Sequence, residues 1–559
     1  MKIVLAQQNY HIGNFEANTS KIIAAVREAK AQGADLVVFS ELCVCGYPPR
    51  DFLEFNDFIE QSMSAVQAIA SEADGIAILV GAPARNERPE GKDLHNSVYF
   101  LEHKQIAKVI HKTLLPTYDI FDEYRYFEPA YGWDVIVYKG KKLAVTVCED
   151  IWDISDNPLY RAKPMDMLMP LQPDIMINLS ASPFDYIHAE ARKEVIAQNV
   201  AQYGLPMLYC NTVGSQTEIV FDGGSVVMDK DRQIIAEFPY FEESVQMVEW
   251  HGDGRITMGH ATPVAYASLP VPAQHFDAQH NIAWVHAALL SGIRDYFRKM
   301  NFSKAIVASS GGIDSAVVLA LACEALGPEH VRALLLPSQF STGHSVSDAE
   351  QLSKNLNNHY DIIPIHGVFE AYESALDPVF SGLSFSVAEE NLQSRIRGAM
   401  VMALSNKFGS ILLNTSNKSE LATGYGTLYG DMAGGLGVLG DLYKMQVYAL
   451  ANYINRNGEI IPQNIVDKAP SAELRPGQKD SDSLPDYREL DAILFQYIER
   501  RQGPKELTAM GFDAALVTRI LKLVNTNEYK RNQFCPIIRV SPKAFGVGRR
   551  MPIVGKYLS

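Results

Sequence analysis

The stretch AIVASSGGIDS, at residues 305–315, constrains the fold of this chain more than any other. Its apolar start predicts a buried strand, and the apolar run at 316–321 predicts a core helix. Small residues from Ser309 to Gly312 form the turn between them. Such a strand, turn and helix start make an anion site, because free backbone N–H groups and the positive helix end point at the turn. Gly311 and Gly312 allow the backbone to approach a phosphate closely.

Three interpretations of this turn differ in how much of its sequence they explain. The loop lacks the Lys of a P-loop, G-x-x-x-x-G-K-[ST], which excludes that kinase or GTPase site. An ordinary Gly-rich turn is the plainer interpretation, and two glycines alone would favour it. The order Ser-Gly-Gly-x-Asp-Ser at 310–315 instead resembles the pyrophosphate-binding loop of ATP pyrophosphatases, which split ATP into AMP and pyrophosphate.

Length, charge and cysteine content limit the classes of protein. A chain of 559 residues is too long for one core and predicts roughly two to four domains. A formal net charge of −15 disfavours nucleic acid as the main partner, since phosphate backbones attract basic surfaces. The six cysteines suggest neither a disulfide framework nor a zinc site. The sequence shows no signal-peptide pattern and no apolar run of membrane-spanning length, so we expect a cytoplasmic protein with no membrane partner. We also expect a homo-oligomer.

The first half alternates apolar runs with segments of helical spacing. A helix is expected at 21–30, before Gly33. The predicted strands are 2–7, 35–39, 76–80, 97–101, 143–147 and 175–179. This alternation predicts a layered α/β unit.

Three residues with catalytic potential follow predicted strands: Glu41, Lys112 and Cys148. A thiol needs a base or a cation nearby to act as a nucleophile at neutral pH. A carboxylate can take its proton, and a lysine can stabilise the thiolate and the oxyanion of an intermediate. A surface glutamate, a solvated lysine and a buried thiol are the plainer interpretation of each residue alone. Their combination favours nucleophilic catalysis.

The surroundings of these residues, SELCVCGYP at 40–48, HKTLLPTYDIFDEYRYF at 111–127 and CEDIW at 148–152, resemble the nitrilase, or carbon–nitrogen hydrolase, superfamily in order and separation. The resemblance covers nearly all of the first half and implies an αββα sandwich. Tyr118 and the segment after it look like those of a glutaminase domain fused to an amidating enzyme. By this resemblance Glu41 is the general base, Lys112 the charge stabiliser and Cys148 the nucleophile that forms a glutamyl thioester.

The same resemblance implies a glutamine site. Tyr118 and Ser182 would hold the substrate, and Glu123 would position Lys112 or the thiol proton. The chain departs from the family at two places, with Ser40 where Pro is usual and His188 where a Lys is frequent. We expect His188 to bind glutamine in place of that lysine.

A stretch rich in Pro, His and Gly at 251–280 separates the halves. It shows no sustained periodicity and predicts a linker along the surface. We therefore expect a first domain at 1–250 and a second at 281–559.

The second half predicts a doubly wound parallel sheet. Helical patterns, among them 348–356, separate the predicted strands 305–308, 331–336, 360–365 and 411–414. Such sheets bind ligands at the carboxyl ends of their strands. The Ser-Gly-Gly loop, Ser338 and Thr415 all lie at such ends, which predicts one shared site.

Further motifs in this half are similar to those of the NAD synthetase family. They are ENLQSRIRG at 390–398, NTSNKSE at 414–420, GYGTLYGDMAGG at 424–435, APSAELRP at 469–476 and EYKR at 528–531. The resemblance assigns ATP to Ser309, Ser310, Gly311, Gly312, Ile313, Asp314, Ser315, Thr415, Lys444 and Ser471. It assigns Mg²⁺ to Asp314 and Glu420, and deamido-NAD to Asn391, Glu420 and Lys530.

Together the two resemblances imply ATP-dependent amidation of deamido-NAD to NAD through an acyl-adenylate, with ammonia from glutamine and with AMP, pyrophosphate and glutamate as products. Another glutamine-dependent amidotransferase of the ATP pyrophosphatase type, acting on a nucleotide such as xanthylate, is the alternative. A tRNA-modifying ATP pyrophosphatase is a second alternative, which the acidic composition disfavours.

Overall fold

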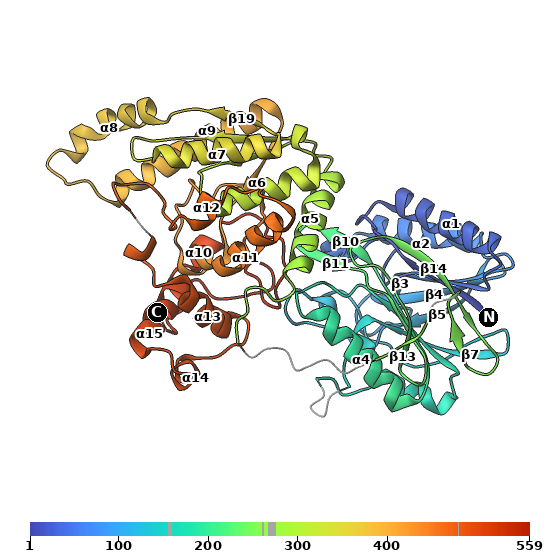
Figure 1. The fold of residues 1–559 in the computed structure, drawn as a ribbon. Helices are drawn as coiled ribbons and strands as arrows, with labels where there is room; N and C mark the ends of the chain where they lie inside the picture. The colour runs from blue at the N-terminus through green and yellow to red at the C-terminus, as the bar shows by residue number, and fades with distance from the viewer. Residues whose placement is uncertain (155–158, 260–261, 267–274, 479, 559) are drawn as a thin grey trace. The chain divides into compact units, whose positions relative to one another are not determined.

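The computed structural model describes residues 1–154, 159–259, 262–266, 275–478 and 480–558. The chain divides into two compact units, Met1–Val271 and Pro272–Ser559 (Figure 1). Part of the predicted linker, including Pro270 and Pro272, lies outside the described residues. Within the ranges that the structure describes, no helix combines the length and apolar character that crossing a bilayer requires.

The first unit contains two seven-stranded sheets. The first has the order β15-β14-β1-β2-β3-β4-β5. Its strands are β1 (Lys2–Gln7), β2 (Leu36–Val38), β3 (Ala77–Arg85), β4 (Leu94–Glu102), β5 (Gln105–His111), β14 (Ser244–Trp250) and β15 (Ile256–Thr257). The second has the order β16-β13-β12-β9-β8-β7-β6. Its strands are β6 (Ile136–Tyr138), β7 (Lys141–Val147), β8 (Ile175–Ser180), β9 (Met207–Asn211), β12 (Val226–Met228), β13 (Gln233–Glu237) and β16 (Val264–Ala265).

Both faces of each sheet are covered, which explains the nearly continuous apolar strands. On β1, Ile3 and Leu5 pack against β7 and β8 of the other sheet, whereas Val4 and Ala6 pack against helices α1 (Phe15–Ala31) and α2 (Asn56–Ala70). Helices α3 (Pro164–Leu168) and α4 (His188–Tyr203) cover the outer face of the second sheet. The αββα sandwich is confirmed. A separate hairpin, β10 (Val213–Gln216) and β11 (Ile219–Asp222), completes the unit.

Two short strands, β15 and β16, lie within residues 251–280, which we expected to form a linker. β15 pairs with β14, and β16 pairs with β13, so both extend sheets of the first unit. Helix α5 (Ile282–Lys299) opens the regular structure of the second unit.

The second unit is built on a five-stranded sheet in which every pair is parallel. Its order is β19-β18-β17-β20-β21, with β17 (Ala305–Ala308), β18 (Val331–Leu335), β19 (His359–Ile362), β20 (Ile411–Asn414) and β21 (Leu436–Gly437). The order of connection reverses between β17 and β20, which is where ligands bind in such sheets. The doubly wound parallel sheet is confirmed.

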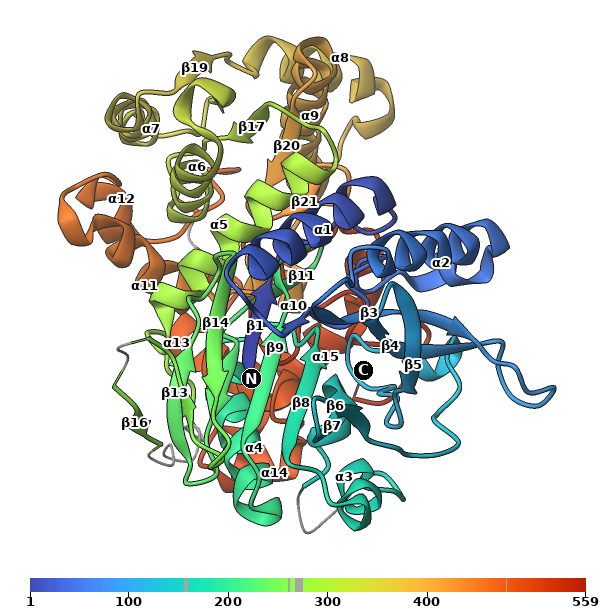
Figure 2. The ribbon, with the colours of Figure 1, turned by 90° about the vertical axis from the view of Figure 1, so that its right-hand side faces the viewer.

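Helices cover both faces of this sheet (Figure 2). One face carries α6 (Ile313–Leu326) and α7 (Gly343–Leu356), and the other carries α8 (His366–Phe380) and α9 (Val387–Phe408). The remaining helices are α10 (Lys418–Thr423), α11 (Lys444–Ile454), α12 (Gln463–Asp467), α13 (Tyr487–Ile498), α14 (Pro504–Ala509), α15 (Ala514–Thr526) and α16 (Glu528–Arg531).

The sequence prediction was wrong about the end of β19. The expected strand reached Ile365, but β19 ends at Ile362, and α8 begins at His366. Pro364 explains the difference, because a proline has no N–H to donate to the sheet.

Candidate active sites

The first candidate site lies where β2, β5 and β7 end. Glu41 comes shortly after β2, Lys112 directly after β5, and Cys148 directly after β7. All three side chains are buried. Lys112 Nζ donates to Glu41 Oε1 at 2.8 Å. The fold therefore joins two of the predicted catalytic residues directly and places the thiol at the third strand end.

Glu123 is the second carboxylate of this site. Lys112 Nζ donates to both of its carboxylate oxygens at 2.8 Å, and the Tyr47 hydroxyl donates to its Oε1 at 2.8 Å. Asn96 Nδ2 donates to Glu41 Oε1 at 2.7 Å. These contacts hold the lysine between two carboxylates.

The backbone at Cys148 is held in an uncommon conformation. Its φ is +42°, in the left-handed region that side chains other than glycine rarely adopt. Asp150 fixes the turn, because its carboxylate accepts from the backbone N–H of Val147 at 3.0 Å and of Leu114 at 2.8 Å. Strained backbone of this kind persists where the surrounding contacts determine it, often at catalytic residues.

The charges of the site decide how the thiol must be activated. Burial, and then the Glu41 carboxylate, raise the pKa of Cys148 well above its ordinary value, while Lys112 acts in the opposite direction. Burial would lower the pKa of Lys112, but Glu123 and Glu41 raise it well above the usual range. Burial raises the pKa of Glu123 to about 7, against the effect of Lys112. A raised pKa favours the protonated thiol, so a nucleophile at this position would need a base. The Glu41 carboxylate lies close enough to Cys148 to raise that pKa.

Two groups of polar side chains contact each other or residues of the segment 148–152. Glu149 accepts from the Tyr118 hydroxyl at 2.9 Å and from the Tyr160 hydroxyl at 3.1 Å. Ser182 Oγ and His188 Nε2 lie 2.8 Å apart. The His188 ring stacks on Trp152 with 4.8 Å between centroids. The structure thus brings Ser182 and His188 together and pairs Tyr118 with Glu149, a residue that sequence reasoning missed.

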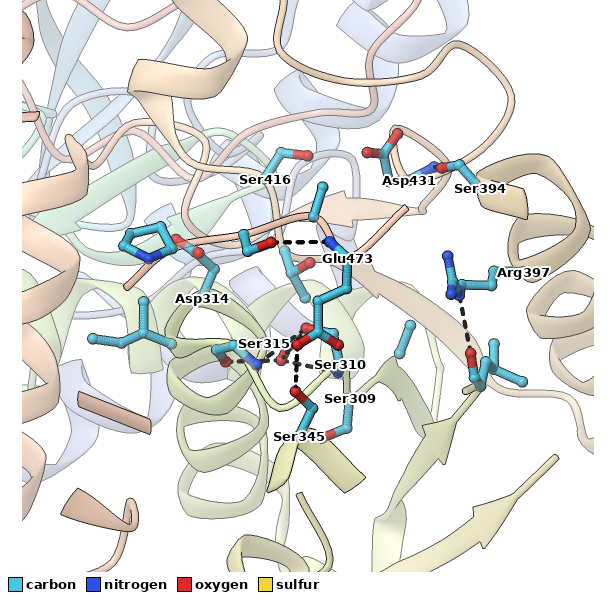
Figure 3. Close-up of a pocket in the computed structure, with 18 of the residues that line it drawn as sticks. Ser309, Ser310, Asp314, Ser315, Ser345, Ser394, Arg397, Ser416, Asp431 and Glu473 are labelled. Atoms are coloured by element: carbon cyan, nitrogen blue, oxygen red, sulfur yellow. Dashed lines mark hydrogen bonds between the residues drawn. The ribbon is translucent and has the colours of Figure 1, made fainter. Parts of the chain in front are cut away.

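The second candidate site is a cavity of about 280 Å³ at the carboxyl ends of β17, β18 and β20 (Figure 3). The residues that we expected to contact ATP and that line it are Ser309, Ser310, Gly312, Ile313, Asp314, Ser315, Thr415, Lys444 and Ser471. Gly311 supports the loop from behind. Its φ is +79°, and a Cβ there would lie 2.2 Å from the Ser345 carbonyl oxygen, so no larger residue fits.

Lys444 joins two carboxylates inside this cavity. Its Nζ forms an ion pair with Asp314 and lies 3.6 Å from Glu420 Oε1. Asn417 Nδ2 donates to Asp314 Oδ1 at 2.9 Å, while Asn417 also caps α10 by accepting from the Glu420 N–H at 3.0 Å. Burial, and then Asp314, raise the pKa of Glu420 to about 8.

This donor set fits a magnesium ion. Asp314 and Glu420 supply carboxylate oxygens, which Mg²⁺ prefers together with substrate phosphates. Asp480 adds a further negative charge, since it also raises the pKa of Glu420. A divalent cation beside Lys444 would lower the repulsion that opposes ionisation of Glu420.

Two residues that we expected to face the dinucleotide have other contacts. Asn391 Oδ1 accepts from the Thr427 hydroxyl at 2.7 Å. Lys530 Nζ donates to the carbonyl oxygens of Gly424 and Gly426, both at 2.8 Å. Neither is among the described residues that line the cavity. Both hold the Gly-rich loop 424–431, whereas Glu420 lies in the cavity itself.

The cavity also contains charged residues that sequence reasoning did not single out. They are Arg397, Asp431, Lys468, Glu473 and Asp480. Arg397, Asp431 and Glu473 stand inside the motifs quoted from the sequence, so their charge within those motifs could have identified them as site residues. Lys468 and Asp480 lie outside these motifs. Arg397 Nε donates to the Leu336 carbonyl oxygen at 3.0 Å, and Figure 3 marks this bond with a dashed line beside Arg397.

These features define a class of protein: a buried-thiol carbon–nitrogen hydrolase unit followed by a nucleotide-binding α/β unit. Residues 2–252 match the carbon-nitrogen hydrolase family model, and residues 285–534 match the NAD synthase family model.

Full-length relatives are more specific. The glutamine-dependent NAD(+) synthetase of Synechocystis sp. is 43% identical over 99% of this chain and 98% of its own length. That of Thermotoga maritima is 40% identical over 100% and 99%. The glutamine-dependent NAD+ synthetase of Acinetobacter baumannii, solved with ADP, is 36% identical, covers 99% of this chain and 98% of its own, and superposes with a TM-score of 0.76. The chain belongs to the glutamine-dependent NAD(+) synthetase family.

Proposed function

We propose that this chain converts deamido-NAD, ATP and glutamine to NAD, AMP, pyrophosphate and glutamate. Residues 1–250 would hydrolyse glutamine, and residues 281–559 would activate and amidate the dinucleotide. One observation carries the proposal: a single chain contains both sites. In the first, Lys112 pairs with Glu41, and Cys148 is a buried thiol. In the second, a Ser-Gly-Gly loop and Lys444 line the same cavity.

In the first reaction Glu41 takes the proton of Cys148, and the sulfur attacks the carboxamide carbon of glutamine. Lys112 stabilises the negative charge that develops on the amide oxygen. Glu41 returns the proton to the leaving nitrogen, which departs as ammonia and leaves a glutamyl thioester. Glu41 then activates a water molecule that releases glutamate and restores the thiol.

The second reaction must activate a carboxylate, which is a poor electrophile because its negative charge resists attack. The nicotinate carboxylate of deamido-NAD attacks the α-phosphorus of ATP, and pyrophosphate leaves. The N–H groups of the loop at Gly312 and the Lys444 ammonium stabilise the charge on pyrophosphate. Ammonia attacks the acyl-adenylate, and AMP leaves with formation of the amide.

Asp314 and Glu420 would hold Mg²⁺ in this cavity. The ion would supply Lewis-acid stabilisation of the phosphate charges. We expect EDTA to abolish AMP and NAD formation and to leave glutamate formation unchanged, with recovery on addition of excess Mg²⁺. Glutamate and AMP are measured in the same samples. If EDTA stopped formation of both glutamate and AMP, or of neither, the assignment of the ion to the second cavity would be wrong.

Glu149 is proposed to recognise the α-ammonium group of glutamine. It is a buried carboxylate next to the nucleophile, oriented by two tyrosine hydroxyls. We expect E149Q to raise the KM for glutamine about tenfold or more, since a charge-assisted hydrogen bond is lost. Hydrolysis of 4-carbamoylbutanoate, which lacks the amino group, should change little. The matched control is E60Q, at an exposed glutamate of α2. An equal loss with both amides would argue against this role.

A panel of carboxylate acceptors tests the proposed function against the alternative amidotransferase. Deamido-NAD, nicotinate mononucleotide and xanthylate are each incubated with ATP and glutamine, and AMP is measured together with the amidated product. We expect AMP formation to be strongest with deamido-NAD. Preference for xanthylate would favour the alternative.

A further inference from the structure

One wall of the nucleotide cavity is formed by the loop after α12. Residues 468–474 all line the cavity, and Ser471 is among them. The loop makes an uncommon turn at Glu473, whose φ is +50°. A non-glycine residue in this region needs stabilising contacts.

The Glu473 side chain supplies such contacts. Its carboxylate accepts from Ser345 Oγ at 2.7 Å, from Thr342 Oγ1 at 3.1 Å and from the Thr342 N–H at 3.3 Å. Lys468 Nζ donates to it at 2.7 Å. Thr342 caps α7, and Ser345 lies in the first turn of that helix. A carboxylate is favoured there by the positive end of the helix.

The same turn of α7 supports the phosphate loop. A Cβ on Gly311 would meet the Ser345 carbonyl oxygen first, so the two backbones are in direct contact. Glu473 is also tied to Ser471, whose hydroxyl accepts from the Glu473 N–H at 3.2 Å. Figure 3 shows the Glu473 carboxylate reaching across the cavity to Ser345, beside Ser309 and Ser310. Glu473 thus connects the loop 468–474 to the α7 turn, and that turn in its own right contacts the phosphate loop.

We propose that Glu473 is a positioning residue for the adenylation step. Its carboxylate fastens the loop 468–474 to the turn that contacts the phosphate loop, so that Ser471 and Ser310 both face the cavity that ATP would enter. A carboxylate that holds the loop in this arrangement lowers the cost of ordering it when ATP binds. The inference rests on the proposed function of this cavity.

The test compares E473Q and E473D with the wild type in ammonium-dependent NAD formation, varying ATP. We expect E473Q to raise the KM for ATP about tenfold, because charge-assisted hydrogen bonds are lost, and to change kcat by less than about threefold. E473D keeps the charge and should lie between E473Q and the wild type. Glutamate formation from glutamine, measured on the same preparations, should be unchanged and reports correct folding of the first unit, while a kcat close to that of the wild type reports folding of the second. E489Q, at an exposed glutamate of α13, is the matched control.

A double variant separates the connection to α7 from a general effect of the loop. S345A removes one hydroxyl partner of Glu473, so E473Q/S345A should raise the KM no more than about twofold beyond E473Q alone. Additive effects, or an unchanged KM in E473Q, would overturn the inference. If the wild type forms AMP normally and E473Q has the same KM for ATP, this inference alone is refuted. A wild type that forms no AMP with deamido-NAD refutes the proposed function.

Discussion

Replacing Cys148 with alanine is expected to lower glutamine-dependent NAD formation by about 10⁴-fold or more and to leave ammonium-dependent formation within about twofold of the wild type. The thiol is the proposed nucleophile, so its removal stops ammonia release. Added ammonium supplies free ammonia directly, and the described residues that line the nucleotide cavity do not include Glu41, Lys112 or Cys148. The measurement is the rate of NAD formation with glutamine and, separately, with ammonium chloride.

The control for C148A is C210A. Cys210 is also a buried thiol of the first unit, but it packs in the hydrophobic core between the sheets. C210A should keep most of its activity with both nitrogen sources. If C148A lost activity with ammonium as fully as with glutamine, the division of labour between the two units would be wrong.

Replacing Lys444 with methionine should have the converse effect. We expect K444M to lower NAD formation by about 10³-fold with glutamine and with ammonium alike, while glutamate formation continues. Methionine keeps much of the volume but leaves Asp314 and Glu420 without the lysine's positive charge, next to the proposed site of the ATP phosphates. Repulsion between these carboxylates and the leaving pyrophosphate would raise the barrier to adenylation.

Exchange of labelled pyrophosphate into ATP, with deamido-NAD present, reports the adenylation step separately from ammonia attack. K444M should lose this exchange, K444R should keep part of it, and K505M, at an exposed lysine of α14, should keep all of it. Continued glutamate formation shows that the first unit of the variant is folded, and partial exchange in K444R shows that the second unit tolerates substitution at this position. Normal exchange in K444M would remove Lys444 from the phosphate site.

The strand ends were the most predictable part of both sites. Glu41, Cys148 and Thr415 each follow a strand whose apolar run is evident in the sequence, because these strands are buried. The direction of a side chain on an irregular segment was harder to predict. Glu149 follows the nucleophile directly, and its contact with Tyr118 depends on a turn with a positive φ at Cys148.

Long-range loop contacts were the least predictable part. Asn391 and Lys530 stand in motifs that resemble dinucleotide-binding ones, yet they contact the loop 424–431, and spacing along the chain does not determine that arrangement. Glu473 reaches Thr342 and Ser345 across more than a hundred residues of sequence. Local periodicity cannot predict such a contact, because the contact depends on where the parallel sheet places α7.

The central claim is that nitrogen released at Cys148 becomes the amide of NAD through an adenylate. The most direct measurement uses glutamine labelled with ¹⁵N in its amide, together with deamido-NAD and ATP, and analyses the products by mass spectrometry. We predict NAD that carries ¹⁵N, with AMP and NAD formed in equal amounts. Formation of ADP in place of AMP, or absence of ¹⁵N from the NAD formed, would contradict the account.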